Sequence, residues 1–134
     1  LGEMEGGEPN DRFSSYWDDD TEMTYPLILA KIPVKNPWEI FAYLPFGNWN
    51  DCPDTPELMA AAKYWFQQHG AIPAAMSHDE LEFELPTPIS KERAMEVAVE
   101  QYGFCPDLDQ NEDGSIGSLA DVLWQSTVWY FWWD

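Results

Sequence analysis

Basic side chains are scarce in this chain of 134 residues, where six lysines and arginines accompany 25 aspartates and glutamates and give a formal charge of −19 at pH 7. So acidic a surface repels phosphates, which excludes nucleic acid and an anionic membrane as expected partners. Eight acids and one arginine lie in residues 1–25, and the rest of the chain is acidic as well. The charge either serves solubility or matches a basic protein partner, whose approach it would accelerate.

Cysteine is also rare, and long apolar runs are missing. Cys52 and Cys105 are too few for a disulfide framework. The chain begins without the basic stretch and apolar segment of a secretory signal. Its longest apolar run, residues 128–133, is too short to cross a bilayer. These absences predict a cytoplasmic protein that does not enter a membrane.

What is present predicts one folded domain. Hydrophobic residues make up 45% of the chain and aromatic residues 16%, and 134 residues suffice to bury one core. Residues 1–24, which are rich in glycine, serine and acids, predict a flexible acidic arm or a segment draped over the domain. Residues 25–134 are expected to form a single α+β domain.

Start and stop signals predict the elements of this domain. Asn36 is expected to cap a helix that ends before Pro45, because Pro37 and Glu39 follow it at the positions typical of a first turn. Thr55 is expected to cap a helix that ends before Gly70. Further helices are expected at residues 90–102 and 118–126, and strands at residues 27–32, 72–76, 81–85 and 127–133. The last strand is apolar without alternation, which predicts burial on both faces. We therefore expect a single sheet of about four strands, packed by three or four helices, with the C-terminal aromatic strand central.

Several sequence features resemble a known family. They are Cys52-Pro53, Tyr64-Trp65-Phe66 followed by Gly70-Ala71, the turn Phe104-Cys105-Pro106-Asp107, and the closing run from Trp129 to Asp134. Over residues 27–134 they make the chain similar to the bacterial DUF4253 family, a domain of unknown function. The resemblance implies a compact bacterial domain and carries no activity with it.

No cofactor is expected, but one segment is similar to a calcium loop. Asp109, Asn111, Asp113 and Ser115 supply oxygen atoms at alternate positions, with glycine at the sixth position. Ala120 stands where the loop needs a bidentate acid. The segment is thus either a weak calcium site, and hence a divalent-metal-binding module, or only a turn between helices.

Thiols, imidazoles and carboxylates form the catalytic candidates. Cys52, Cys105, His69 and His78 would suffice for one zinc ion, yet no close ligand pair occurs among them. Cys105 with a distant histidine could also act as a nucleophile, and a buried structural thiol is the alternative. His78, Asp79, Glu80, Glu82 and Glu84 are acid–base candidates, although alternation along the strand predicts that Glu82 and Glu84 face water.

The terminal aromatic residues predict either a ligand pocket or the densest part of the core. The residues proposed for ligand binding are Trp49, Cys52, Cys105, Asp107, Trp129, Trp132, Trp133 and Asp134. Because no complete catalytic set appears, we expect a non-enzymatic acidic protein that neutralises or regulates a basic protein, as the immunity protein of a bacterial toxin does. A small hydrolase or transferase that uses Cys105, His78 or the carboxylates is the alternative, and the oligomeric state stays open.

Overall fold

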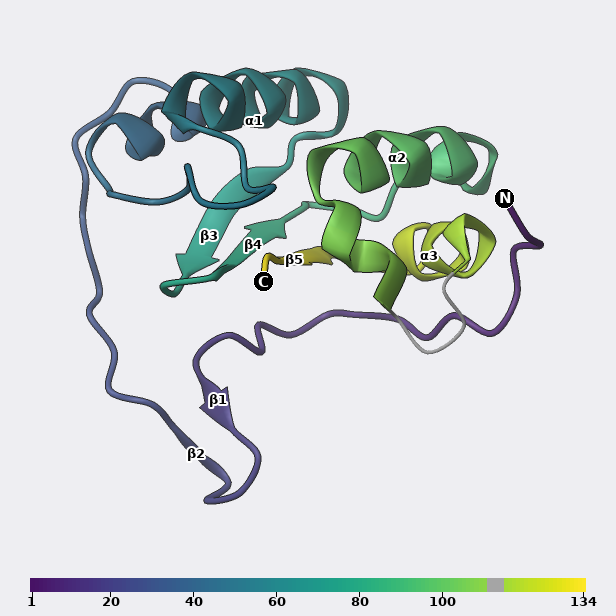
Figure 1. The fold of residues 1–134 in the computed structure, drawn as a ribbon, viewed down its shortest axis with the longest axis horizontal. Coiled ribbons are helices and arrows are strands. Elements are labelled where there is room, and N and C mark those ends of the chain that lie inside the picture. Colours follow the sequence, from purple (N-terminus) through teal and green to yellow (C-terminus); the bar gives the residue numbers. More distant parts are fainter. Residues whose placement is uncertain (111–114) are drawn as a thin grey trace.

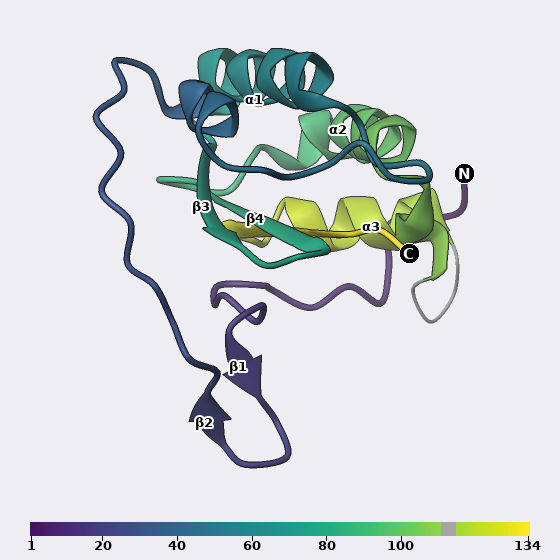
Figure 2. The ribbon, with the colours of Figure 1, turned by 60° about the vertical axis from the view of Figure 1, so that its left-hand side comes forward.

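A three-stranded antiparallel sheet lies at the centre of the fold, which we describe from a computed structural model for residues 1–110 and 115–134. The strands are β3 (Ile72–Met76), β4 (Glu80–Glu84) and β5 (Val128–Trp132), with β4 in the middle. Helices α1 (Thr55–His69) and α2 (Lys91–Phe104) cover one face of this sheet, and the N-terminal segment crosses the other (Figures 1 and 2). Helix α3 (Ile116–Leu123) packs on α2.

The expected helices are present, with small changes at their ends. Asp54 rather than Thr55 is the N-cap of α1, because its carboxylate accepts a hydrogen bond of 3.1 Å from the Glu57 N–H. Gly70 closes the same helix in the left-handed conformation, as expected. The segment after Asn36 forms a 3₁₀ helix, η1 (Pro37–Ala42), and a second one, η2 (Pro106–Gln110), follows α2.

The prediction of a single sheet of about four strands is wrong, while the α+β class is confirmed. Strands β1 (Trp17–Asp18) and β2 (Met23–Thr24) form a separate two-stranded sheet. Residues 27–32, which we expected to be a strand, have no strand partner in the described part of the chain. Their apolar side chains lie outside the core, and Ile28 and Leu29 are 94% and 101% exposed.

The prediction that the C-terminal strand is central is also wrong, because within residues 1–110 and 115–134 the strand β5 pairs with β4 and with no other strand. Its side chains do alternate. Trp129, Phe131 and Trp133 enter the core, while Tyr130 and Trp132 face the other side and donate hydrogen bonds to acids. An aromatic side chain with a polar group can thus stand on a partly polar face, so the apolar run did not require burial on both faces.

The core is dense in aromatic rings from the sheet and from α1. Trp65 of α1 stacks on Phe131 at 5.6 Å between ring centroids and meets Phe83 and Trp129 edge to face. Leu81, Phe83 and Leu85 point into this core, as their alternation predicted.

The N-terminal segment runs along α3 and then across the sheet. The Gly117 N–H donates to the Leu1 carbonyl at 2.7 Å, and the Asp121 carboxylate accepts from the Gly7 N–H at 2.9 Å. Gly7 has no room for a side chain, since a Cβ there would lie 2.5 Å from the backbone nitrogen of Val122. This close approach fixes the path of the segment, although its flexibility in solution stays a prediction.

The same segment buries Glu82, which corrects our expectation that this side chain faces water. Glu82 is fully buried, and its carboxylate accepts hydrogen bonds from the N–H groups of Ser14 and Ser15 at 2.8 to 3.1 Å. Glu84 is exposed, as expected. A buried carboxylate needs hydrogen-bond donors, and two backbone N–H groups supply them here.

Among the helices of the described residues, none is both long enough and apolar enough to cross a membrane.

Candidate functional site

A hairpin made of β1 and β2 projects from the body of the molecule (Figure 1). It carries four acids, Asp18 at the end of β1 and Asp19, Asp20 and Glu22 in the turn. The Asp18 carboxylate accepts a hydrogen bond of 2.9 Å from the Asp20 N–H. Within residues 1–110 and 115–134, none of these four acids forms an ion pair. Their charge is therefore available to an approaching partner.

Exposed aromatic and sulfur side chains stand beside these acids. Trp17, Met23 and Tyr25 are all exposed, with Met23 at 66%. The pKa of the Tyr25 hydroxyl is raised, chiefly by the charge of Asp18 and also by Asp19, Asp20 and Glu80. Nearby negative charge disfavours the phenolate and so raises the pKa of a tyrosine. The raised pKa therefore indicates a negative potential at the hairpin. We call residues 17–25 the acidic hairpin.

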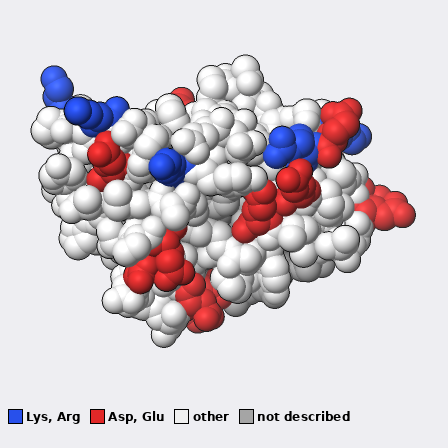
Figure 3. Space-filling view, turned by 90° about the horizontal axis from the view of Figure 1, so that it is seen from above, with Lys and Arg blue, Asp and Glu red and all other residues white. Residues whose placement is uncertain are grey.

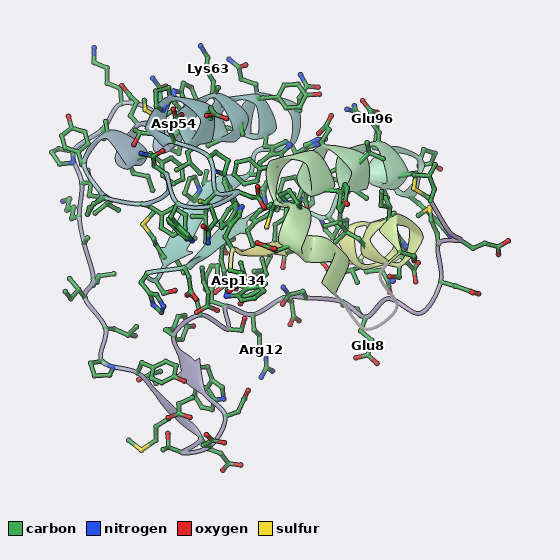
Figure 4. All side chains as sticks on the ribbon, viewed as in Figure 1. Glu8, Arg12, Asp54, Lys63, Glu96 and Asp134 are labelled. Carbon is green, nitrogen blue, oxygen red and sulfur yellow. The ribbon has the colours of Figure 1, made fainter. Side chains whose placement is uncertain are left out.

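The helical side of the molecule carries charges of both signs. Figure 3 shows lysines and arginines among the acids on the face formed by the helices, and Figure 4 places Lys63 and Glu96 there. By contrast, Arg12 is the one basic residue in residues 1–25. The acidic hairpin is thus the more uniformly negative part of the surface.

The turn between β3 and β4 holds the predicted acid–base residues in hydrogen bonds to β5. Glu80 accepts a short hydrogen bond of 2.6 Å from the Tyr130 hydroxyl, and Asp79 accepts one of 3.1 Å from the Trp132 indole. The Ser77 hydroxyl accepts from the Glu80 N–H at 3.1 Å. His78 contacts Asp79 at 3.4 Å, but its side chain is 89% exposed. These contacts tie the turn to β5, while Glu82 and Glu84 lie apart on β4.

Six of the predicted ligand-binding residues come together at the C-terminus: Trp49, Cys52, Cys105, Asp107, Trp133 and Asp134. The Asp134 N–H donates to the Asp107 carboxylate at 3.0 Å, and the Asn50 amide donates to the Asp134 carbonyl at 2.8 Å. The rings of Trp49 and Trp133 lie 6.4 Å apart. The contacts join the 46–54 loop, η2 and the end of β5 into one packed corner.

The two thiols of this corner are buried and not disulfide-bonded. Burial raises the pKa of each to about 12, and the negative charge of Asp107 contributes to the increase at Cys105. The Cys105 thiol also donates to the Trp132 carbonyl at 3.1 Å. A nucleophilic cysteine acts as the thiolate, so neither thiol is prepared for catalysis at neutral pH.

The remaining predicted residues lie elsewhere. Trp129 packs against His69 in the core at 5.9 Å, and Trp132 belongs to the turn already described. His69 has a lowered pKa, chiefly because of burial. Within the described residues, no group of three or more histidines, cysteines or acids could hold a metal ion. The calcium prediction depends on Asn111 and Asp113, which fall outside them.

Comparison with known proteins assigns the family. A family model described as a domain of unknown function, DUF4253, matches residues 28–134. The chain belongs to the DUF4253 family. Comparisons with curated proteins and with solved structures found no match. The acidic hairpin, and the serines that bind Glu82, precede the part of the chain that matches DUF4253.

Sequence reasoning missed the hairpin as a surface feature. Its two strands span two residues each, too short to produce a detectable alternation. The acidic run 18–20, bracketed by Trp17 and Met23, is the signal that could have found it. The contact between Glu82 and Ser15 joins residues that are 67 apart in the sequence, and no pattern of neighbouring residues predicts it.

Proposed function

We propose that this DUF4253 protein is a non-enzymatic acidic binding protein that neutralises or regulates a basic protein partner, in the manner of an immunity protein. The observation that carries the proposal is the projecting hairpin, where four acids that form no ion pair with any described residue stand beside exposed Trp17, Met23 and Tyr25. Aromatic anchors within a charged rim are typical of protein interfaces.

Electrostatics support a basic partner rather than a neutral one. The formal charge of −19 attracts cationic proteins over several ångströms, and the hairpin concentrates that charge at an exposed site. The buried thiols support a binding role over cysteine catalysis, since their raised pKa values keep them protonated at neutral pH.

The test neutralises three of the four acids of the hairpin without changing its shape. In the variant Asp18→Asn/Asp19→Asn/Asp20→Asn each new amide keeps an acceptor oxygen, so the turn bond to Asp18 can still form. A matched control neutralises three exposed acids of the helical side: Glu57→Gln/Glu92→Gln/Glu96→Gln. Both variants have the same net charge.

The measurement is capture of proteins from a lysate of the source organism, followed by elution in rising salt and identification by mass. We expect the wild-type chain and the control to retain a basic protein that elevated salt releases, and the hairpin variant to lose it. Equal retention by both variants would refute a role for the hairpin. Absence of any specific basic protein would refute the proposed function itself.

A further inference from the structure

Across a groove, one edge of the sheet faces a segment of chain, and neither has a strand neighbour on that side within residues 1–110 and 115–134. β3 has β4 on one side and no strand of the described residues on the other. Residues 27–32, here called the strap, pass on that side of the sheet in both Figure 1 and Figure 2. The strap has the sequence of a strand, and its Ile28 and Leu29 are almost fully exposed.

Two hollows lie between β3 and the strap. One hollow, of about 540 Å³, has Ile40 and Leu44 among its lining residues. The other, of about 610 Å³, has Phe13 and Tyr25. Both are lined by Ile28 and Leu29 of the strap and by residues 74–77. We call the two hollows together the β3 groove.

The hollows lie on opposite faces of the sheet. The smaller one includes Leu81, which points into the core, and the larger one includes Glu80, which bonds to Tyr130 on the other face. Successive side chains of a strand point to opposite faces. A strand added to β3 would therefore place alternate side chains in the two hollows.

One end of the β3 groove is acidic. Glu80 lines it, Asp79 is the neighbouring residue, and the charges of Asp18, Asp19 and Asp20 reach Tyr25 of the same lining. A segment lying antiparallel to β3 would have its amino end here, because β3 runs toward Ser77. Lysine or arginine at that end would complement the acids.

We propose that the β3 groove binds an extended segment of the partner protein, apolar at alternate positions and basic at its amino end, which adds to β3 as a further strand. Strand addition of this kind uses backbone hydrogen bonds for affinity and alternate pockets for specificity. The bound segment lies between β3 and the strap, so it gives both a strand neighbour. This inference rests on the proposed function and names the chemistry that the partner presents.

The probe is a nine-residue peptide with two lysines at its amino end, followed by alternating valine and threonine. One comparison peptide carries N-methyl groups on alternate backbone amides, and another has glutamate in place of lysine. Binding to the full chain is measured by fluorescence anisotropy, and amide hydrogen exchange locates the site. The variant Ile28→Ser changes the strap, and Val99→Ser, at an exposed position of α2, is the matched control.

We expect saturable binding, and at least tenfold weaker binding of both comparison peptides. Ile28→Ser should weaken binding of the peptide about tenfold, because Ile28 would contact the bound peptide. Val99→Ser should leave binding unchanged, because Val99 lies on α2, away from the groove. Amides of residues 28–30 and 74–76 should exchange more slowly in the complex. No binding at millimolar peptide, equal binding of the N-methylated peptide, or protection elsewhere would overturn the inference.

The strap itself or a second copy of this chain could instead occupy the groove, and hydrogen exchange distinguishes both from a partner segment. Either result would overturn the inference. If residues 28–30 and 74–76 are already as protected as β4 in the unbound chain, the strap itself fills the groove. If that protection grows with protein concentration, a second copy does. A basic partner that Ile28→Ser binds as tightly as the wild-type chain does, but that the hairpin variant loses, would refute the groove and leave the proposed function standing.

Discussion

Replacing Glu82 by glutamine should loosen the N-terminal segment and destabilise the fold. The buried carboxylate accepts from the N–H groups of Ser14 and Ser15, and the glutamine amide has a single acceptor oxygen. Its NH₂ group would then face a backbone donor. Because a hydrogen bond to a charged group contributes about 1.5–3 kcal/mol, we expect the free energy of unfolding to fall by about 2 kcal/mol.

Glu84→Gln is the matched control, since Glu84 is exposed on the same strand, and it should change stability by less than about 0.5 kcal/mol. Urea unfolding followed by tryptophan fluorescence gives the stability, and hydrogen exchange at Ser14 and Ser15 reports on the contact. In Glu82→Gln these two amides should exchange faster. If the two variants unfold at the same urea concentration, the assigned role of Glu82 is refuted.

Three further predictions follow from packing and protonation. Gly7→Ala places a Cβ against the backbone of α3, so residues 1–10 should become sensitive to protease, whereas continued resistance would contradict the close approach. Gly103→Ala meets no atom within 4 Å in α2, so thermal unfolding should show it more stable by about 0.5–1 kcal/mol, and no gain would contradict the open environment. Burial raises the pKa of Cys52 and Cys105 from 9.0 to about 12, so the folded chain binds more protons than the unfolded chain across this range. Urea titrations should show stability falling as pH rises from about 9 toward 12, less steeply in Cys52→Ala/Cys105→Ala, and an unchanged slope in that variant would refute the assignment.

Helix positions were predictable from the sequence because their signals are local. Pro56 and Glu57 in the first turn and Gly70 at the end are a few residues from the structure they determine, and α1 matches them. The error at its N-cap, Asp54 instead of Thr55, is one residue, because both side chains can accept from a backbone N–H.

Strand pairing was less predictable, since it depends on partners far away in the sequence. Residues 27–32 have strand composition, yet composition does not supply a neighbour. In the part of the chain that the structure describes, the segment has no strand partner, and residues 27–31 are exposed. In β5 all residues are apolar or aromatic, so the sequence does not show which side chains face the core. The structure shows that Tyr130 and Trp132 face the other side, because they donate hydrogen bonds to Glu80 and Asp79.

The candidate sites divide in the same way. The sequence grouped Cys105, Asp107 and Asp134 as possible site residues, and the structure joins them in one corner together with Asn50, which we had not named. The β3 groove combines Phe13, Ile28, Ile40 and residues 74–77, and nothing in their order along the chain relates them.

The sequence by itself determined the charge, the approximate positions of the helices, the α+β class and the inward side chains of β4, because each depends on composition or on neighbours within one element. Only the tertiary structure decided that β5 is an edge strand, that Glu82 is buried and that the hairpin projects. Those outcomes depend on which distant backbone groups meet a given strand or carboxylate. Hydrogen bonds between residues 67 apart, such as that from Ser15 to Glu82, leave no periodic mark on either segment.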